Sequence, residues 1–261
     1  MDCAKIIGQR AEFQFRLAGP MILGGFRRSF KKALDETAYA ELTYQLVGMN
    51  NKADIADWPE TKRKLVDASV ALVRKQGYHA TTVDHICSEA GVTKGGFFHY
   101  FKSKEDLAKA TIEWFGENKA REFREAPFSR LADPLERIYG RLDYAKESVG
   151  GANRVTKGCP IGMIAQELAS THPAMRDVCQ DYFSRLAKDL AKDLAEAKTV
   201  HAPDADFDPF NVAMLYVSMI QGSMMLAKTA EANTVLMENV EQFRRYLKGL
   251  FNQPANVPTH A

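Results

Sequence analysis

The stretch GVTKGGFFHYFKSKEDL, at positions 91–107, constrains the fold more than any other part of the sequence. Thr93 is a good helix-capping residue, and it predicts a short helix at residues 94–100. Gly95 and Gly96 lie inside this helix, where each costs roughly 1 kcal/mol relative to alanine. Ring-bearing side chains follow at once. The glycines destabilise this short helix and aromatic residues follow them, so we expect its exposed side to have a function.

Two helices are predicted before this one. Asp57 and Glu60 have the spacing of a capping box, and they open a first helix that ends at Gly77. Its apolar positions recur with helical spacing, at Leu65, Ala68, Ser69, Leu72 and Val73. Thr81 or Thr82 caps the second helix, VDHICSEA, which stops at the following glycine. Helices with a glycine-containing tight turn between the second and the third match a helix-turn-helix, in which the third helix enters the major groove of DNA.

A helical wheel divides the side chains of the third helix. Phe97 and Phe101 share one side and are expected to be core anchors. Gly95 and His99 point the opposite way, and the flanks carry Gly96 and Phe98. Because glycine has no Cβ, an outward glycine lets the backbone approach base edges or phosphates closely.

The stretch TTVDHICSEAGVTKGGFFHYFKSKEDL, with the preceding TKRKLVDASVALVRKQGYHA, resembles the DNA-binding domain of the TetR family of bacterial transcription regulators. Residues 58–251 fit the size of that family and its layout of about nine helices. The resemblance implies an all-α fold in which an N-terminal three-helix helix-turn-helix domain precedes a C-terminal helical domain for ligand binding and dimerisation. An extra N-terminal extension is added here.

The resemblance also implies which residues meet DNA. Those expected at or near phosphates are Thr82, Phe98, Tyr100 and Lys104. Those expected at or near base edges are Thr93, Lys94, Gly96 and His99, and the wheel adds Gly95.

The chain departs from the family pattern at three positions. Phe98 stands where tyrosine is usual, so a phosphate hydrogen bond is expected to be missing. Gly96 stands where a hydroxyl or methyl side chain is common, which weakens direct readout there. Cys87 stands where alanine is usual, and we interpret it as a packing residue.

Capping and breaking residues predict the helices of the C-terminal domain. Ser103 caps a long helix that runs past Trp114, and five more are expected at about residues 134–149, 160–170, 173–198, 209–230 and 235–251. The predicted domains are an extension that is poorly ordered or partly helical (1–56), the helix-turn-helix domain (57–103), the ligand-binding and dimerisation domain (104–252) and a flexible tail (253–261).

The N-terminal extension leaves alternatives open. It carries a basic cluster at Arg27, Arg28, Lys31 and Lys32, and Met49 lies just ahead of the first well-capped helix. The extension is either poorly ordered chain, or the product of a misplaced start codon, or a basic arm that contacts DNA phosphates.

Composition excludes several classes. The chain of 261 residues, 46% apolar and 26% charged, is ordinary for a globular protein, and a net charge of +2 does not argue for nucleic acid by itself. No uncharged apolar run approaches the ~20 residues that span a bilayer, and no secretory signal is evident. Four cysteines at spacings unlike a disulfide framework indicate a reducing compartment, so the expected location is the cytoplasm, without a membrane partner.

The last two predicted helices are the expected interface of a homodimer, which the resemblance implies. Methionines and Gly222 line the first, and an apolar stripe lines the second. Together with their symmetry mates they would form a four-helix bundle, and the operator would be a near-palindrome.

A small-molecule effector is expected to change the spacing of the recognition helices. Candidates for the lining of its pocket are Trp114, Tyr139, Leu142, Cys159, Ile161, Ile164, Phe183 and Met214, although each of them also fits an ordinary core position.

Cys159 begins a predicted helix beside Lys157, an arrangement that lowers the pKa of a thiol and favours a nucleophilic thiolate. A branch of TetR-like repressors carries a similar Gly-Cys motif here. The alternative is a helix-capping or buried thiol. Cys87, His79 and His85 match no zinc spacing, so neither a metal nor a cofactor is expected.

The sequence therefore predicts a ligand-responsive, sequence-specific DNA-binding regulator, most simply a repressor released from a palindromic operator by a small molecule. One alternative is a repressor that senses electrophiles or oxidants through Cys159. An alternative of another class is an all-helical enzyme or lipid-binding protein with this fold. The absence of a carboxylate pair, catalytic triad, phosphate loop or HExxH sequence argues against an enzyme.

Overall fold

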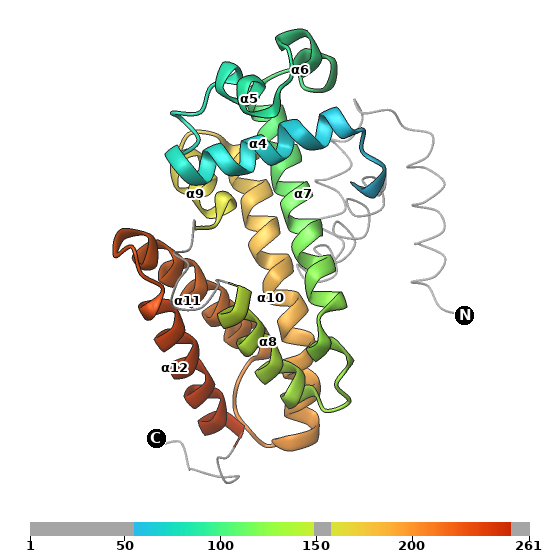
Figure 1. Cartoon of the computed structure of the whole chain (residues 1–261). Helices are drawn as coiled ribbons and strands as arrows, with labels where there is room; N and C mark the ends of the chain where they lie inside the picture. The colour runs from blue at the N-terminus through green and yellow to red at the C-terminus, as the bar shows by residue number, and fades with distance from the viewer. Residues whose placement is uncertain (1–54, 149–157, 252–261) are drawn as a thin grey trace, which may run out of the picture. The chain divides into compact units, whose positions relative to one another are not determined.

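The computed structural model describes residues 55–148 and 158–251, and every regular element in these ranges is helical (Figure 1). The 3-10 helix η2 (Ile55–Asp57) precedes the helices α4 (Glu60–Gln76), α5 (Val83–Ala90), α6 (Lys94–Tyr100) and α7 (Lys104–Glu125). They are followed by η3 (Pro127–Arg130), α8 (Pro134–Ser148), α9 (Pro160–Leu168), α10 (Pro173–His201), α11 (Pro209–Thr229) and α12 (Thr234–Phe251). The all-α fold is confirmed, and the described residues from Trp58 onward belong to one compact unit.

Side-chain caps open most of the helices around the turn. The hydroxyl of Thr82 accepts the backbone N–H of His85 at 3.1 Å, and that of Thr93 accepts the N–H of Gly96 at 3.2 Å. Ser103 caps α7 in the same way. The predicted capping box of α4 is wrong, because its N-cap is Pro59 and no side chain caps this end. The helix is held by packing instead.

Helices α4, α5 and α6 and the first turn of α7 enclose one apolar cluster, here called the DNA-binding core. It consists of Leu65, Val66, Ala68, Leu72, Ile86, Cys87, Phe97, Phe101 and Leu107. Phe97 and Phe101 are buried as the helical wheel predicts, and Cys87 is a buried packing residue. Because Leu107 belongs to α7, this helix completes the DNA-binding core.

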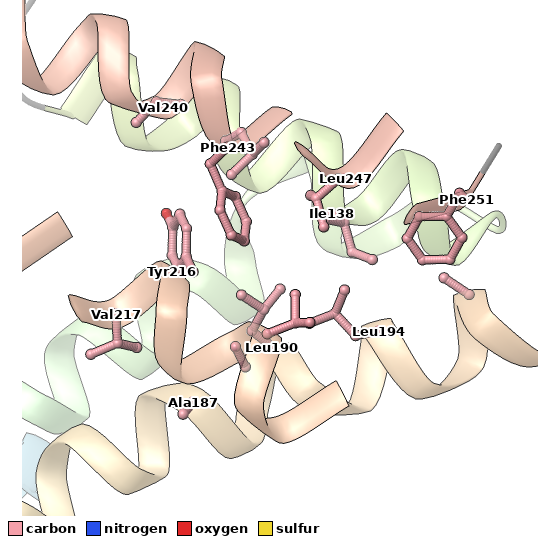
Figure 2. Packing of buried hydrophobic residues seen from close by; sticks show 14 of the residues in the cluster. Ile138, Ala187, Leu190, Leu194, Tyr216, Val217, Val240, Phe243, Leu247 and Phe251 are labelled. Atoms are coloured by element: carbon pink, nitrogen blue, oxygen red, sulfur yellow. The ribbon is translucent and has the colours of Figure 1, made fainter. Parts of the chain in front are cut away.

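A second cluster, the bundle core, joins α8, α10, α11 and α12. Figure 2 shows Ile138, Leu190, Tyr216 and Phe243 converging in it from these helices. Helix α11 packs against both α10 and α12. Although α11 is long and apolar enough to cross a membrane by length and composition, the core helix of a soluble protein passes the same test. Several of its side chains lie in the bundle core, namely Val212, Ala213, Tyr216 and Val217.

The third cluster, the junction core, lies where α4, α7, α9 and α10 meet. Its buried members are Val73, Tyr78, Ala108, Ile112, Cys159, Ile161, Ile164, Leu168, Met175, Cys179 and Tyr182. Ile161, Ile164 and Leu168 are fully buried, so three of the nine residues of α9 anchor it here. The junction core thereby connects α4 to the helices of the C-terminal part.

Candidate DNA-binding site

Helix α6 buries one side and exposes the other. Lys94, Gly95, Phe98 and His99 are exposed, whereas Phe97 is fully buried. Phe98 is 57% exposed, and its ring meets that of Phe97 edge-on with the centroids 5.1 Å apart. The exposed side therefore combines a cation, an imidazole and an apolar ring, the groups that hydrogen-bond to base edges or contact thymine methyl groups in a major groove.

The two glycines of α6 have different structural roles. A Cβ on Gly95 would meet only the hydroxyl oxygen of Thr93, at 3.9 Å, so this side of the backbone is open. A Cβ on Gly96 would lie 2.8 Å from Cγ1 of Val92. The interpretation from sequence is that a missing side chain lets the backbone approach DNA closely. The open space at Gly95 is consistent with it. Gly96 instead allows the turn to pack closely on its own helix.

Both predicted lysines have partners within the protein. Nζ of Lys94 lies 2.8 Å from the carboxylate of Asp84, and this hydrogen bond and charge raise the pKa of Lys94. Nζ of Lys104 donates to the carbonyls of Tyr78 at 3.1 Å and Thr81 at 2.9 Å. Burial lowers the pKa of Lys104. Two of its three N–H donors are therefore used inside the protein, and the predicted contact of Lys104 with a phosphate stays a prediction.

The remaining DNA-binding candidates are still able to contact DNA. Thr82 and Thr93 accept backbone N–H groups as caps, and their hydroxyl hydrogens remain able to donate to phosphates. Tyr100 is half-buried, and its ring lies edge-on to His99 with the centroids 4.7 Å apart. The ring of Tyr100 thus contacts that of His99, which lies on the exposed side of α6.

The structure divides the predicted ligand-lining residues among three clusters. Tyr139, Leu142 and Met214 lie in or against the bundle core, Cys159, Ile161 and Ile164 lie in the junction core, and Phe183 packs against both. Trp114, the remaining candidate, lies outside these two clusters. It packs on the DNA-binding core, stacks on Trp58 with centroids 5.5 Å apart, and donates from Nε1 to Asp67 at 3.0 Å.

Cys159 is the N-cap of α9, and its Sγ accepts the N–H of Gly162 at 3.5 Å. Burial raises the pKa of this thiol, and the N–H groups of Gly162 and Ile161 offset that effect only in part. The predicted lowering of the pKa is therefore wrong, because desolvation outweighs the helix terminus. Lys157 lies outside the described residues.

His79 and His85 are exposed, while Cys87 is buried in the DNA-binding core. Within residues 55–148 and 158–251, no group of three or more His, Cys, Asp or Glu side chains is arranged to hold a metal ion.

Glu167 is a functional candidate that the sequence does not reveal. Its carboxylate on α9 accepts the N–H groups of Tyr78 and His79 in the loop that joins α4 to α5. A lone glutamate separated from its partners by 89 and 88 residues gives no signal in one sequence.

Two family models match the chain. The model for bacterial regulatory proteins of the tetR family matches residues 65–111, and that for the C-terminal domain of LmrA/YxaF-like transcriptional regulators matches residues 134–242. The HTH-type transcriptional regulator YxaF of Bacillus subtilis is 28% identical over 184 residues, which cover 70% of this chain and 93% of that protein.

Two further proteins show the same relationship. An HTH-type transcriptional regulator of the lacX 3' region of Lactococcus lactis is 28% identical over 181 residues, which cover 69% of this chain and 90% of that protein. The crystal structure of regulatory protein TetR from Rhodobacter sphaeroides superposes with a TM-score of 0.64 at 26% identity, covering 70% of this chain and 97% of that one.

Proposed function

The chain belongs to the TetR family of bacterial transcription regulators, and we propose that it is a repressor that a small molecule releases from a near-palindromic operator. The observation that carries this proposal is the exposed side of α6, where Lys94, Gly95, Phe98 and His99 lie together over a buried phenylalanine. In a helix-turn-helix such a side faces the base edges.

The proposed repressor is a homodimer formed through α11 and α12. These helices expose large apolar side chains at Phe210, Leu215, Met225, Leu226 and Tyr246. Gly222 lies on α11 between two of them, and a Cβ built there meets nothing within 4 Å. Exposed apolar side chains beside a glycine allow a second copy to approach closely, and a two-fold dimer presents two recognition helices to two half-sites.

The effector is proposed to act on the helices of the bundle and junction cores, because α9 and α10 connect these cores to α4. Electrophile sensing through Cys159 is less favoured, since the thiol is buried and its pKa is raised. The protein acts by binding, not by catalysis, and an operator-binding protein works in the cytoplasm with the chromosome. Whether residues 1–54 contribute a basic arm lies outside the described residues.

Selection from fragmented genomic DNA at moderate salt tests the function. The full chain should repeatedly retain the same fragments, and these should share a near-palindrome whose half-sites are separated by about one helical turn or more. A chain that starts at Met49 provides the comparison for the basic arm, and equal operator affinity of the two chains would exclude that arm. Retention of no particular fragment would exclude the regulator.

A further inference from the structure

The loop at residues 77–81, which joins α4 to α5, is hydrogen-bonded to the carboxylate of Glu167 on α9. Oε1 of Glu167 accepts the N–H of Tyr78 at 2.8 Å, and Oε2 accepts the N–H of His79 at 2.7 Å. Both oxygens are therefore used by consecutive backbone donors. Hydrogen bonds to an ionised acceptor are roughly twice as strong as neutral ones.

The absence of a side chain at Gly77 leaves room for the carboxylate of Glu167. Its φ of +85° favours glycine, and a Cβ built there would lie 2.6 Å from Oε1 of Glu167. The sequence indicates Gly77 only as the end of a helix. In the structure the same glycine also lets the carboxylate reach the loop.

The side-chain ammonium group of Lys104, on α7, binds the same loop. Lys104 donates to the carbonyls of Tyr78 and Thr81, so the backbone of Tyr78 donates to Glu167 and accepts from Lys104. Lys104 is the first residue of α7, four positions after the end of α6. The loop thus connects α9 with the segment that directly follows the recognition helix.

The loop also determines where α5 begins. Thr81 is buried and donates its hydroxyl to the carbonyl of Gly77 at 2.7 Å, and Thr82 caps α5. Helix α9, at the other end of the contact, is fixed in the junction core by its buried side chains. Because Glu167 belongs to α9, its hydrogen bonds couple the position of α9 to the loop, and through the loop to the start of α5.

We propose that Glu167 is the positioning residue that holds the helix-turn-helix in its DNA-binding arrangement, and that opening of its contact with residues 78 and 79 lowers operator affinity. The inference rests on the proposed function. By linkage, if the closed contact favours DNA binding, then bound operator must favour the closed contact.

The test uses the full chain and an operator fragment recovered by genomic selection. Glu167→Gln keeps the size of the side chain, but its NH2 group faces a backbone N–H, so one hydrogen bond is lost. Its operator affinity should fall about tenfold or more, while affinity for a shuffled duplex stays near that of the wild type. Glu125→Gln, an exposed position at the end of α7, removes the same charge and should leave both affinities unchanged.

Amide hydrogen exchange on the wild type separates positioning from general stability. Operator should slow exchange at Tyr78 and His79, whereas an equal concentration of the shuffled duplex should slow it less. The proposal is overturned if operator leaves these two amides unchanged, or if Glu167→Gln binds operator like the wild type. The exchange experiment decides the matter even if the variant folds poorly. A wild-type chain that binds no fragment would instead overturn the proposed function, and this inference with it.

Discussion

At the scale of single residues, the recognition helix balances DNA contact against its own stability. Gly95 has open space where a side chain would stand, whereas Gly96 faces Val92 at a distance that a Cβ cannot share. Lys94 carries a positive charge on the side expected to face DNA, yet it forms an ion pair with Asp84 in the free protein. These details decide the outcome of three substitutions.

Gly95→Ala should stabilise the fold by up to about 1 kcal/mol, because alanine favours the helix and meets no obstacle. Gly96→Ala is its matched control and should gain less or lose stability, since its methyl group presses on Val92. Urea unfolding of both variants measures the difference. Operator affinity of Gly95→Ala should fall, so a variant that is more stable and binds as tightly as the wild type would show that DNA does not approach the backbone here.

Asp84→Asn should increase affinity for any duplex at low salt, because it frees Lys94 and removes a negative charge near the DNA. The dependence of log affinity on log salt should steepen by about one for each recognition helix. Asp204→Asn, in the exposed loop between α10 and α11, makes the same charge change elsewhere. Equal salt slopes for the two variants would show that the charge of Lys94 does not reach the DNA.

At the scale of elements, local sequence signals predict where the helices lie, but they do not predict which residues of distant helices contact one another. The hydroxyl caps and the 3.6-residue period place α5, α6 and α7, and the wheel assigns Phe97 and Phe101 inward. The partners of Lys104 and Glu167 lie 23 to 89 residues away, so no local pattern reveals them. Similarly, the sequence offers Trp114 as a candidate for the pocket lining, and tertiary packing places its ring against that of Trp58.

The start of α9 provides a prediction about Cys159. Burial raises the pKa of its thiol, so the neutral form predominates at neutral pH. Iodoacetamide should therefore label Cys159 much more slowly in the folded protein at pH 7.5 than in urea, and peptide mapping of the labelled chain measures this. Rapid labelling of native Cys159 would instead favour the electrophile-sensing alternative.

At the scale of the whole molecule, binding to a near-palindromic operator requires two copies of the chain. The sequence indicates α11 and α12 as the interface, and the structure shows exposed apolar side chains on both. Most of the side chains that are candidates for the effector pocket also fill the bundle and junction cores, so no sequence pattern distinguishes a ligand site. The fold is therefore predictable from sequence to a greater extent than the ligand site.

Gly222→Trp should break the dimer and leave the monomer folded, because the first atom of the new side chain meets nothing within 4 Å in one chain. Sedimentation should then show a monomer with a helical circular-dichroism spectrum, and operator affinity should fall because two half-sites are no longer bound together. Val200→Trp, at a 60% exposed position on α10, controls for the added ring. A dimer that persists in Gly222→Trp would place the interface elsewhere.

Sequence readout by the exposed side of α6 is tested by the ratio of operator to shuffled-duplex affinity, measured for the wild type and His99→Ala at fixed salt. The wild type should favour its operator by about 10³-fold or more. His99→Ala should reduce this ratio about tenfold with little change in affinity for the shuffled duplex, since a base contact is worth roughly 1–3 kcal/mol. An unchanged ratio in His99→Ala would show that another surface reads the operator, and a wild-type ratio near one would contradict sequence-specific regulation.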